Sequence, residues 1–314
     1  MFDLILTLLI LAVSLIVLAS ASHFAINFVE KLIELTGLSE ASVGFVILAV
    51  MTSTPEIIVA LFSVLQGTPG ISVGDILGSN MFNIGVVLGI LGMLGFLKTC
   101  CTDLLVELTD ILFLITLVPL LLVISHYHIF DVASPIVGAI LLAIFAVNIY
   151  FMTRKRTPPV KVTSEKARKG NTKTILAKLF ISITFVAIAA DLVVYSGTSI
   201  AIALGAPPIL IGAKIVAIGT SLPELTLDFT AVRRGRVQLA IGDIIGSNLT
   251  NLTLVLGIVL LASPFAFDMT IFTEILPFLL ITTIIFWRFL TKGGVSQVGG
   301  IILIMIYILF QAVI

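Results

Sequence analysis

Charge is scarce in this sequence: only 11% of its 314 residues are Asp, Glu, Lys or Arg, and 59% are hydrophobic. Such a composition excludes an ordinary soluble protein, because each membrane-spanning helix needs about 20 apolar residues. The two cysteines, Cys100 and Cys101, are adjacent, which excludes a disulfide framework and a Cys/His metal-binding spacing. The composition therefore indicates an integral membrane protein with several spans.

Motifs for catalysis are also missing. The chain has no Ser/His/Asp set, no phosphate-binding loop and no His-Glu-x-x-His motif. We therefore expect no enzyme, no cofactor and no nucleic-acid partner. The partners we expect are a lipid bilayer and metal cations, for the reasons given below.

Apolar runs separated by short polar breaks predict an all-α polytopic protein with ten transmembrane helices. Residues 1–22 look like a signal peptide, but Asp3 stands where a basic segment would be, so we interpret them as a retained span. The predicted spans are residues 3–24, 40–66, 70–97, 104–125, 132–152, 175–199, 208–232, 237–262, 269–289 and 295–313.

An internal repeat divides these spans into two groups of five. Residues 44–90 and 212–258 share 20 identities in 47 ungapped positions, at an offset of 168 residues. We predict a first five-span repeat at 1–152, a basic linker at 153–174 and a second repeat at 175–314.

The placement of Lys and Arg predicts the orientation. Nine of the 17 lie between Arg154 and Lys178, which places the linker in the cytoplasm. With five spans on each side, both termini are then predicted outside the cell membrane, and the two repeats have opposite orientations. Inverted repeats are typical of carriers that open a midplane site to each side in turn.

A proline and a glutamate interrupt one predicted span in each half. The sequences are Met51-Thr52-Ser53-Thr54-Pro55-Glu56 and Gly219-Thr220-Ser221-Leu222-Pro223-Glu224. Proline removes a backbone hydrogen bond, and a charge at the centre of a span costs roughly 2.5–3.5 kcal/mol, so such a residue is a functional candidate. The carboxylate, hydroxyl and carbonyl oxygens gathered here are the ligands that hard cations prefer. A kink with a structurally paired glutamate is the alternative for one copy, but two matching copies favour a transport site.

A second repeated block, Gly-Asp-Ile-x-Gly-Ser-Asn-x-x-Asn, covers residues 74–83 and 242–251. In a helix, Ser79 and Asn83 share a face, as do Ser247 and Asn251. These side chains either complete an oxygen cage or only join neighbouring helices by hydrogen bonds. The glycines of the block allow helices to approach closely.

Three aspartates are weaker candidates. For Asp75 and Asp243 we favour a role in the first turn of a helix, beside the helix dipole, over attraction of cations at the two vestibules. Asp228 lies one turn beyond Glu224, where the first half has Ala60. It either assists a second ion or pairs with Arg233 or Arg234.

Both blocks together resemble the alpha-repeats of the cation/Ca2+ antiporter superfamily, specifically the sodium/calcium exchanger branch of prokaryotic type. The resemblance implies a calcium:cation antiporter that works by alternating access and is driven by Na+. The metal ligands that it implies are Thr52, Ser53, Glu56, Ser79, Asn83, Thr220, Ser221, Glu224, Ser247 and Asn251.

The sequence departs from this family pattern at several positions. Met51 and Thr54 replace the usual glycine and leucine, and Asp75 and Asp243 replace asparagine. Asn251 stands where some sodium-coupled members have aspartate, which keeps an H+-coupled Ca2+ exchanger open as the main alternative. A cation channel with the same carboxylates is a further alternative.

Overall fold

The structure, a computed structural model, describes residues 2–36, 39–65, 69–98, 102–127, 133–154, 172–203, 217–263 and 269–313. Helices and no strands form in this part of the chain. Eight helical stretches are long and apolar enough to cross a membrane, and the helix Gln297–Val313 is apolar but shorter. The prediction of an all-helical multi-pass membrane protein is confirmed, whereas the number ten stays a prediction because the seventh predicted span begins outside the described residues.

The first half of the chain contains α-helices and two π-helical segments, η1 and η2. In order, they are α1 Phe2–Thr36, α2 Glu40–Val43, η1 Gly44–Leu48, α3 Ala49–Thr52, α4 Thr54–Leu65, α5 Pro69–Phe82, η2 Asn83–Val87, α6 Leu88–Met93, α7 Asp103–Thr116, α8 Leu120–His126 and α9 Ser134–Arg154.

The second half follows a related order. Its elements are α10 Thr172–Ala203, α12 Ala217–Thr220, α13 Leu222–Arg233, α14 Val237–Thr250, the π-helical segment η5 Asn251–Val255, α15 Leu256–Ala262, α16 Met269–Thr291 and α17 Gln297–Val313. The interrupted helix α12–α13 corresponds to α3–α4, and α14–η5–α15 corresponds to α5–η2–α6.

One predicted span boundary is wrong. The first span does not end at residue 24, because α1 continues to Thr36. Polar groups on this extension have partners: Asn27 and Glu30 both accept hydrogen bonds from Arg234 at the end of α13. The linker at 153–174 stays a prediction; at its ends, α9 continues to Arg154 and α10 begins at Thr172. Residues 155–171 lie outside the described residues.

The interrupted helices pack in the centre against the helices of the second repeated block. Helix α14 contacts α2, η1 and α3, while α5 contacts α12. Glycine makes this possible: a Cβ on Gly242 would lie 2.6 Å from the Ala41 carbonyl oxygen, and one on Gly246 would lie 2.6 Å from the Ala49 Cβ. The predicted close approach is confirmed at these positions, but a Cβ on Gly74 would meet no described atom within 4 Å.

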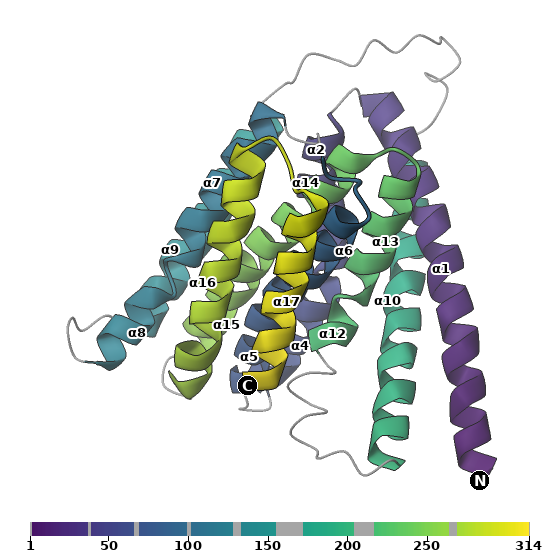
Figure 1. The fold of residues 1–314 in the computed structure, drawn as a ribbon, viewed down its shortest axis with the longest axis horizontal. Helices are drawn as coiled ribbons and strands as arrows, with labels where there is room; N and C mark the ends of the chain where they lie inside the picture. The colour runs from purple at the N-terminus through teal and green to yellow at the C-terminus, as the bar shows by residue number, and fades with distance from the viewer. Residues whose placement is uncertain are drawn as a thin grey trace.

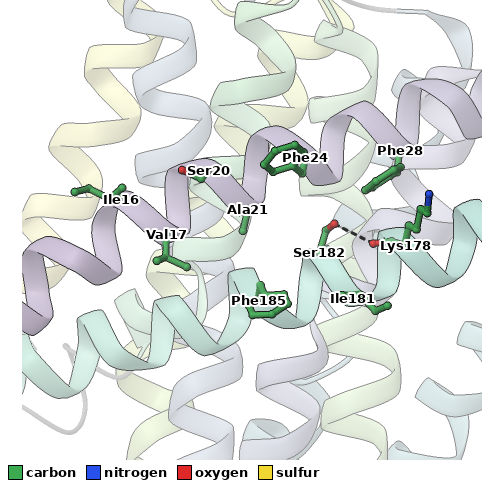
Figure 2. A pocket seen from close by; sticks show the side chains of 10 residues that line it. All are labelled: Ile16, Val17, Ser20, Ala21, Phe24, Phe28, Lys178, Ile181, Ser182 and Phe185. Carbon is green, nitrogen blue, oxygen red and sulfur yellow. Dashed lines mark hydrogen bonds between the residues drawn. The ribbon is translucent and has the colours of Figure 1, made fainter.

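Helices α1 and α10 lie side by side at one edge of the bundle, and the chain ends lie at the same end of it (Figure 1). An open groove of about 550 Å³ runs between these two helices. Phe24 and Phe28 of α1 and Phe185 of α10 line it, with Lys178 toward one end (Figure 2). The groove is apolar and shares no residue with the buried polar centre described next.

Ion pairs join the end of α1 and the start of α2 to the turn between α13 and α14. Arg236 contacts Glu40 at 2.7 Å and Glu30 at 3.4 Å, and Arg234 contacts Glu30 at 3.4 Å. The hydrogen bond to Glu40 raises the pKa of the Arg236 guanidinium above its ordinary value. The pairs are partly exposed, so each contributes little stability, but together they fix the turn at this end of the bundle.

Candidate cation-binding site

Both interrupted helices break at the serine that lies two residues before the proline of the Pro-Glu pair. Helix α3 ends at Thr52, Ser53 has φ −74° and ψ 6°, and α4 begins at Thr54. In the second half Ser221 has φ −90° and ψ 3° between α12 and α13. Proline supplies no N–H to the preceding turn, so the ladder of backbone hydrogen bonds is interrupted at the same point in both copies. The predicted helix breaks are confirmed.

Glu56 and Glu224 lie at the first turns after these breaks and are fully buried. The two carboxylates interact with each other electrostatically, so both lie in the same buried region of the protein. Thr220 lies near Glu56 and Thr52 lies near Glu224, yet none of the four glutamate oxygens has a hydrogen-bond partner among the described residues. A buried charge without a partner is strongly unfavourable, so these oxygens require a cation or a proton.

The threonines of one half bond to the second block of the other half. The Thr52 hydroxyl lies 3.1 Å from the Ser247 hydroxyl, and the Thr220 hydroxyl lies 3.1 Å from that of Ser79. These two contacts are equivalent under the 168-residue offset. They bring predicted site residues of both halves into one cluster.

Asp75 and Asp243 belong to the same buried cluster. Thr220 donates a 2.9 Å hydrogen bond to Asp75, and the Thr52 hydroxyl lies 3.4 Å from Asp243. Each aspartate is the seventh residue of its helix, well past the first turn, and is almost completely buried. The interpretation that favoured a first-turn role is therefore wrong, whereas the alternative, attraction of cations at the two vestibules, stays a prediction.

Asp228 faces the cluster as well. It is fully buried and interacts with Asp243 and Glu224, but neither of its oxygens has a hydrogen-bond partner in the described structure. The alternative that it pairs with Arg233 or Arg234 is wrong. Arg234 bonds to groups on α1, and the Arg233 guanidinium lies 5.9 Å from the centre of the Phe229 ring.

Four asparagines form a network across the centre. Asn83 donates to the side-chain oxygen of Asn248 at 3.1 Å, and Asn251 donates to that of Asn80 at 3.2 Å. Asn80 also donates to the Asn248 backbone oxygen at 3.1 Å. Sequence reasoning did not assign roles to Asn80 and Asn248, although both recur in the repeated block. They orient the amides of Asn83 and Asn251.

This network leaves specific oxygens without protein partners. The Asn83 and Asn251 side-chain oxygens and the Ser53 and Ser221 hydroxyls are all buried and have no hydrogen-bond partner among the described residues. Asn83 and Asn251 each begin a π-helical segment, a distortion that often occurs at functional sites. Buried polar groups are normally paired, so this set of unused oxygens marks a place for a ligand.

The donor set fits a hard cation. It offers carboxylate, amide and hydroxyl oxygens, which Ca2+ prefers, and the described residues bring no imidazole or thiolate to it. Among these residues, no group of three His, Cys, Asp or Glu side chains is arranged as a ready metal centre. A bound cation would therefore take ligands from both halves, with neutral oxygens beside the glutamates.

A helical membrane bundle with unpartnered carboxylates on two broken helices has the features of an ion transporter. The family comparison agrees, because the profile of the sodium/calcium exchanger protein family matches residues 6–154 and 174–314. The chain belongs to this family.

Similar proteins span nearly the whole chain. It is 26% identical to the sodium/calcium exchanger MaX1 of Methanosarcina acetivorans, with 97% of each chain covered. It is 30% identical to the putative antiporter CaxA of Alkalimonas amylolytica, over 74% of this chain and 73% of the relative. A solved structure of the sodium-calcium exchanger NCX_Mj, soaked with 2.5 mM Na+ and 10 mM Sr2+, matches with a TM-score of 0.83 at 25% identity, over 99% of each chain.

Proposed function

We propose that this protein is a calcium:cation antiporter that moves Ca2+ across the cell membrane in exchange for Na+. The observation that carries the proposal is the pair Glu56 and Glu224. Both are buried, both follow a helix break, they interact with each other, and neither carboxylate has a hydrogen-bond partner among the described residues. The charges of two carboxylates balance those of one divalent ion. Family membership and the relatives named as sodium/calcium exchangers support the same function.

The Ca2+ ligands we propose come from both halves of the chain. Ser53, Ser221, Asn83 and Asn251 each offer an oxygen that no described group uses. Two hydroxyl pairs join the halves, Thr52 with Ser247 and Thr220 with Ser79. These hydroxyls either hold the two halves together beside the ion or exchange their hydrogen bonds for bonds to the metal. With the glutamates, the set reaches the roughly six to eight oxygens that Ca2+ takes.

Alternating access follows from inverted repeats, which we propose for this chain together with ten spans and a cytoplasmic linker. Three observations support the architecture: the 168-residue offset, the equivalent Thr–Ser contacts between halves, and chain ends that lie at the same end of the bundle (Figure 1). In such carriers the site stays near the midplane while the gates on its two sides open in turn.

Obligatory exchange has a physical cause in this site. Closing both gates over an empty site would leave carboxylates buried without compensation, at a cost of several kcal/mol. A bound Ca2+ or a set of Na+ ions removes that cost. The protein therefore changes its accessible side only when loaded, which couples the two fluxes.

The experiment is calcium-45 uptake into proteoliposomes that contain the purified protein. An outward Na+ gradient should drive uptake, and a pH gradient without Na+ should not. Uptake with the pH gradient alone would instead select the H+-coupled exchanger, in which protons neutralise the glutamates. Calcium flux down its own gradient with no counter-ion requirement would indicate a channel.

A further inference from the structure

Among the residues whose burial the structure describes, the second half of the chain has one buried carboxylate more than the first. Asp228 lies on α13 one turn after Glu224 and is fully buried. The residue at the equivalent place in the first half is Ala60, which is also buried. The cluster is therefore asymmetric in charge, because the first half of the chain supplies Glu56 and Asp75 and the second half supplies Glu224, Asp228 and Asp243.

No cationic side chain among the described residues compensates the buried carboxylate of Asp228, which lies within hydrogen-bond reach of the Asp243 carboxylate. Its carboxylate interacts with those of Asp243 and Glu224, while both of its own oxygens and one oxygen of Asp243 have no hydrogen-bond partner within the described ranges. Neither neighbouring arginine reaches it: Arg234 bonds to α1, and Arg233 lies over Phe229. Two adjacent buried carboxylates repel each other unless a cation or a shared proton lies between them.

We propose that Asp228 and Asp243 form a separate Na+ subsite, present only in the second half of the chain. This inference rests on the proposed Na+/Ca2+ exchange. The Glu56–Glu224 pair already balances a divalent ion, so the extra carboxylate adds capacity for a monovalent one. A second Ca2+ fits poorly, because three unused carboxylate oxygens are far fewer than the six to eight that Ca2+ takes, and because the first Ca2+ would repel it.

The place of the subsite gives it a role in coupling. Asp228 lies farther along α13 than Glu224, toward Arg233, which is the cytoplasmic end in the proposed topology. Na+ entering from the cytoplasm meets this pair beside the Ca2+ site. Its binding places a positive charge next to Glu224 and so favours release of Ca2+. Asp228 thus increases by one the number of Na+ ions that exchange for each Ca2+.

The test compares wild-type protein with the variants Asp228→Asn and Asp228→Ala in proteoliposomes. Alanine is the residue that the first half has at the equivalent position. The control is Asp103→Asn, the same chemical change as Asp228→Asn on an exposed side chain. The membrane potential at which net Ca2+ flux reverses gives the number of Na+ ions per Ca2+, and calorimetry gives Ca2+ affinity. We expect both Asp228 variants to exchange about one Na+ fewer and to bind Ca2+ within roughly threefold of wild type. Asp103→Asn should match wild type.

Three results would overturn the subsite. An unchanged coupling ratio in both variants would show that Asp228 holds no transported ion. A loss of Ca2+ binding would place Asp228 in the Ca2+ site itself. An unchanged ratio with a new pH dependence would mean that the pair holds a proton.

If wild-type protein shows no Na+-driven Ca2+ flux, the proposed function fails first. If only the variants behave unexpectedly, the function stands and the subsite does not. Na+-dependent thermal stabilisation of wild-type protein, without Ca2+, checks the subsite should the variants not fold.

Discussion

Replacing Glu224 with glutamine tests the proposed site without changing its shape. The substitution keeps the size of the side chain and removes one of the two charges that face each other at the helix breaks. Glu224 is fully buried and both of its oxygens are unpartnered in the described structure. In the absence of Ca2+, the change removes an uncompensated charge, so the melting temperature should stay the same or rise.

The loss of Ca2+ affinity can be estimated from the same burial. In the loaded site, the Glu224 carboxylate and Ca2+ form a buried pair of opposite charges. Removing one partner of such a pair costs about 3–5 kcal/mol, which corresponds to roughly a 10²- to 10³-fold higher Kd or more. At a Ca2+ concentration 100 times the wild-type Kd, ligand binding stabilises the wild-type fold by about 2.7 kcal/mol. In the variant the same concentration lies near or below Kd, so the stabilisation falls to about 0.4 kcal/mol or less.

The assay is thermal unfolding of the purified protein with and without Ca2+, followed by calorimetric titration. The matched control is Glu274→Gln, the same chemical change on an exposed side chain of α16, which should keep the full Ca2+-dependent shift. A Glu224→Gln variant that retains near-native Ca2+ affinity would refute the assignment. A variant that unfolds without Ca2+ at a clearly lower temperature would refute the argument that this carboxylate is unfavourable when the site is empty.

Three further substitutions test packing, ligand orientation and surface charge. Gly246→Ala would bring a Cβ within 2.6 Å of the Ala49 Cβ and should lower the free energy of unfolding by about 1–3 kcal/mol. The control is Gly74→Ala, whose added Cβ meets nothing within 4 Å. Melting curves that do not separate the two variants would contradict the packing argument. Asn80→Ala removes an orienting hydrogen bond without changing charge and should weaken Ca2+ binding about tenfold; an unchanged Kd would remove its positioning role. Arg236→Gln should lower the free energy of unfolding by under about 1 kcal/mol, and by less at high salt, because the Arg236 side chain is 35% exposed. A loss of several kcal/mol in thermal unfolding would show that its ion pairs contribute more than their exposure suggests.

The centre of the site could be predicted from the sequence because its signals are local and repeated. Pro55 and Pro223 fix the helix breaks by their own chemistry, and each is followed directly by a glutamate. The offset of 168 residues then required the two copies to be equivalent. The buried, interacting carboxylates of Glu56 and Glu224 agree with that expectation.

The aspartates could not be placed in this way. Their depth depends on where α5 and α14 begin and on which helices cross them, and neither is set by neighbouring residues. Asp75 is covered by Thr220, 145 positions away in the chain, and Asp243 by Thr52, 191 positions away. A role in the first turn of a helix was the more local interpretation, and tertiary packing overrides it.

The length of α1 shows the same limit. Residues beyond position 24 look like a polar end of a span when considered alone. They remain helical because Arg234, more than 200 positions later, supplies donors to Asn27 and Glu30. Asn80 and Asn248 recur in the repeated block, but only the network of hydrogen bonds shows that they orient Asn83 and Asn251.

A crystal structure of the protein soaked with Sr2+, an electron-rich substitute for Ca2+, would test the central claim most directly. Anomalous scattering locates the ion independently of the protein chain. We predict one strong peak between α4 and α13, with carboxylate oxygens of Glu56 and Glu224 both within bonding distance. A peak bound by only one of these glutamates, or found away from both, would contradict the account.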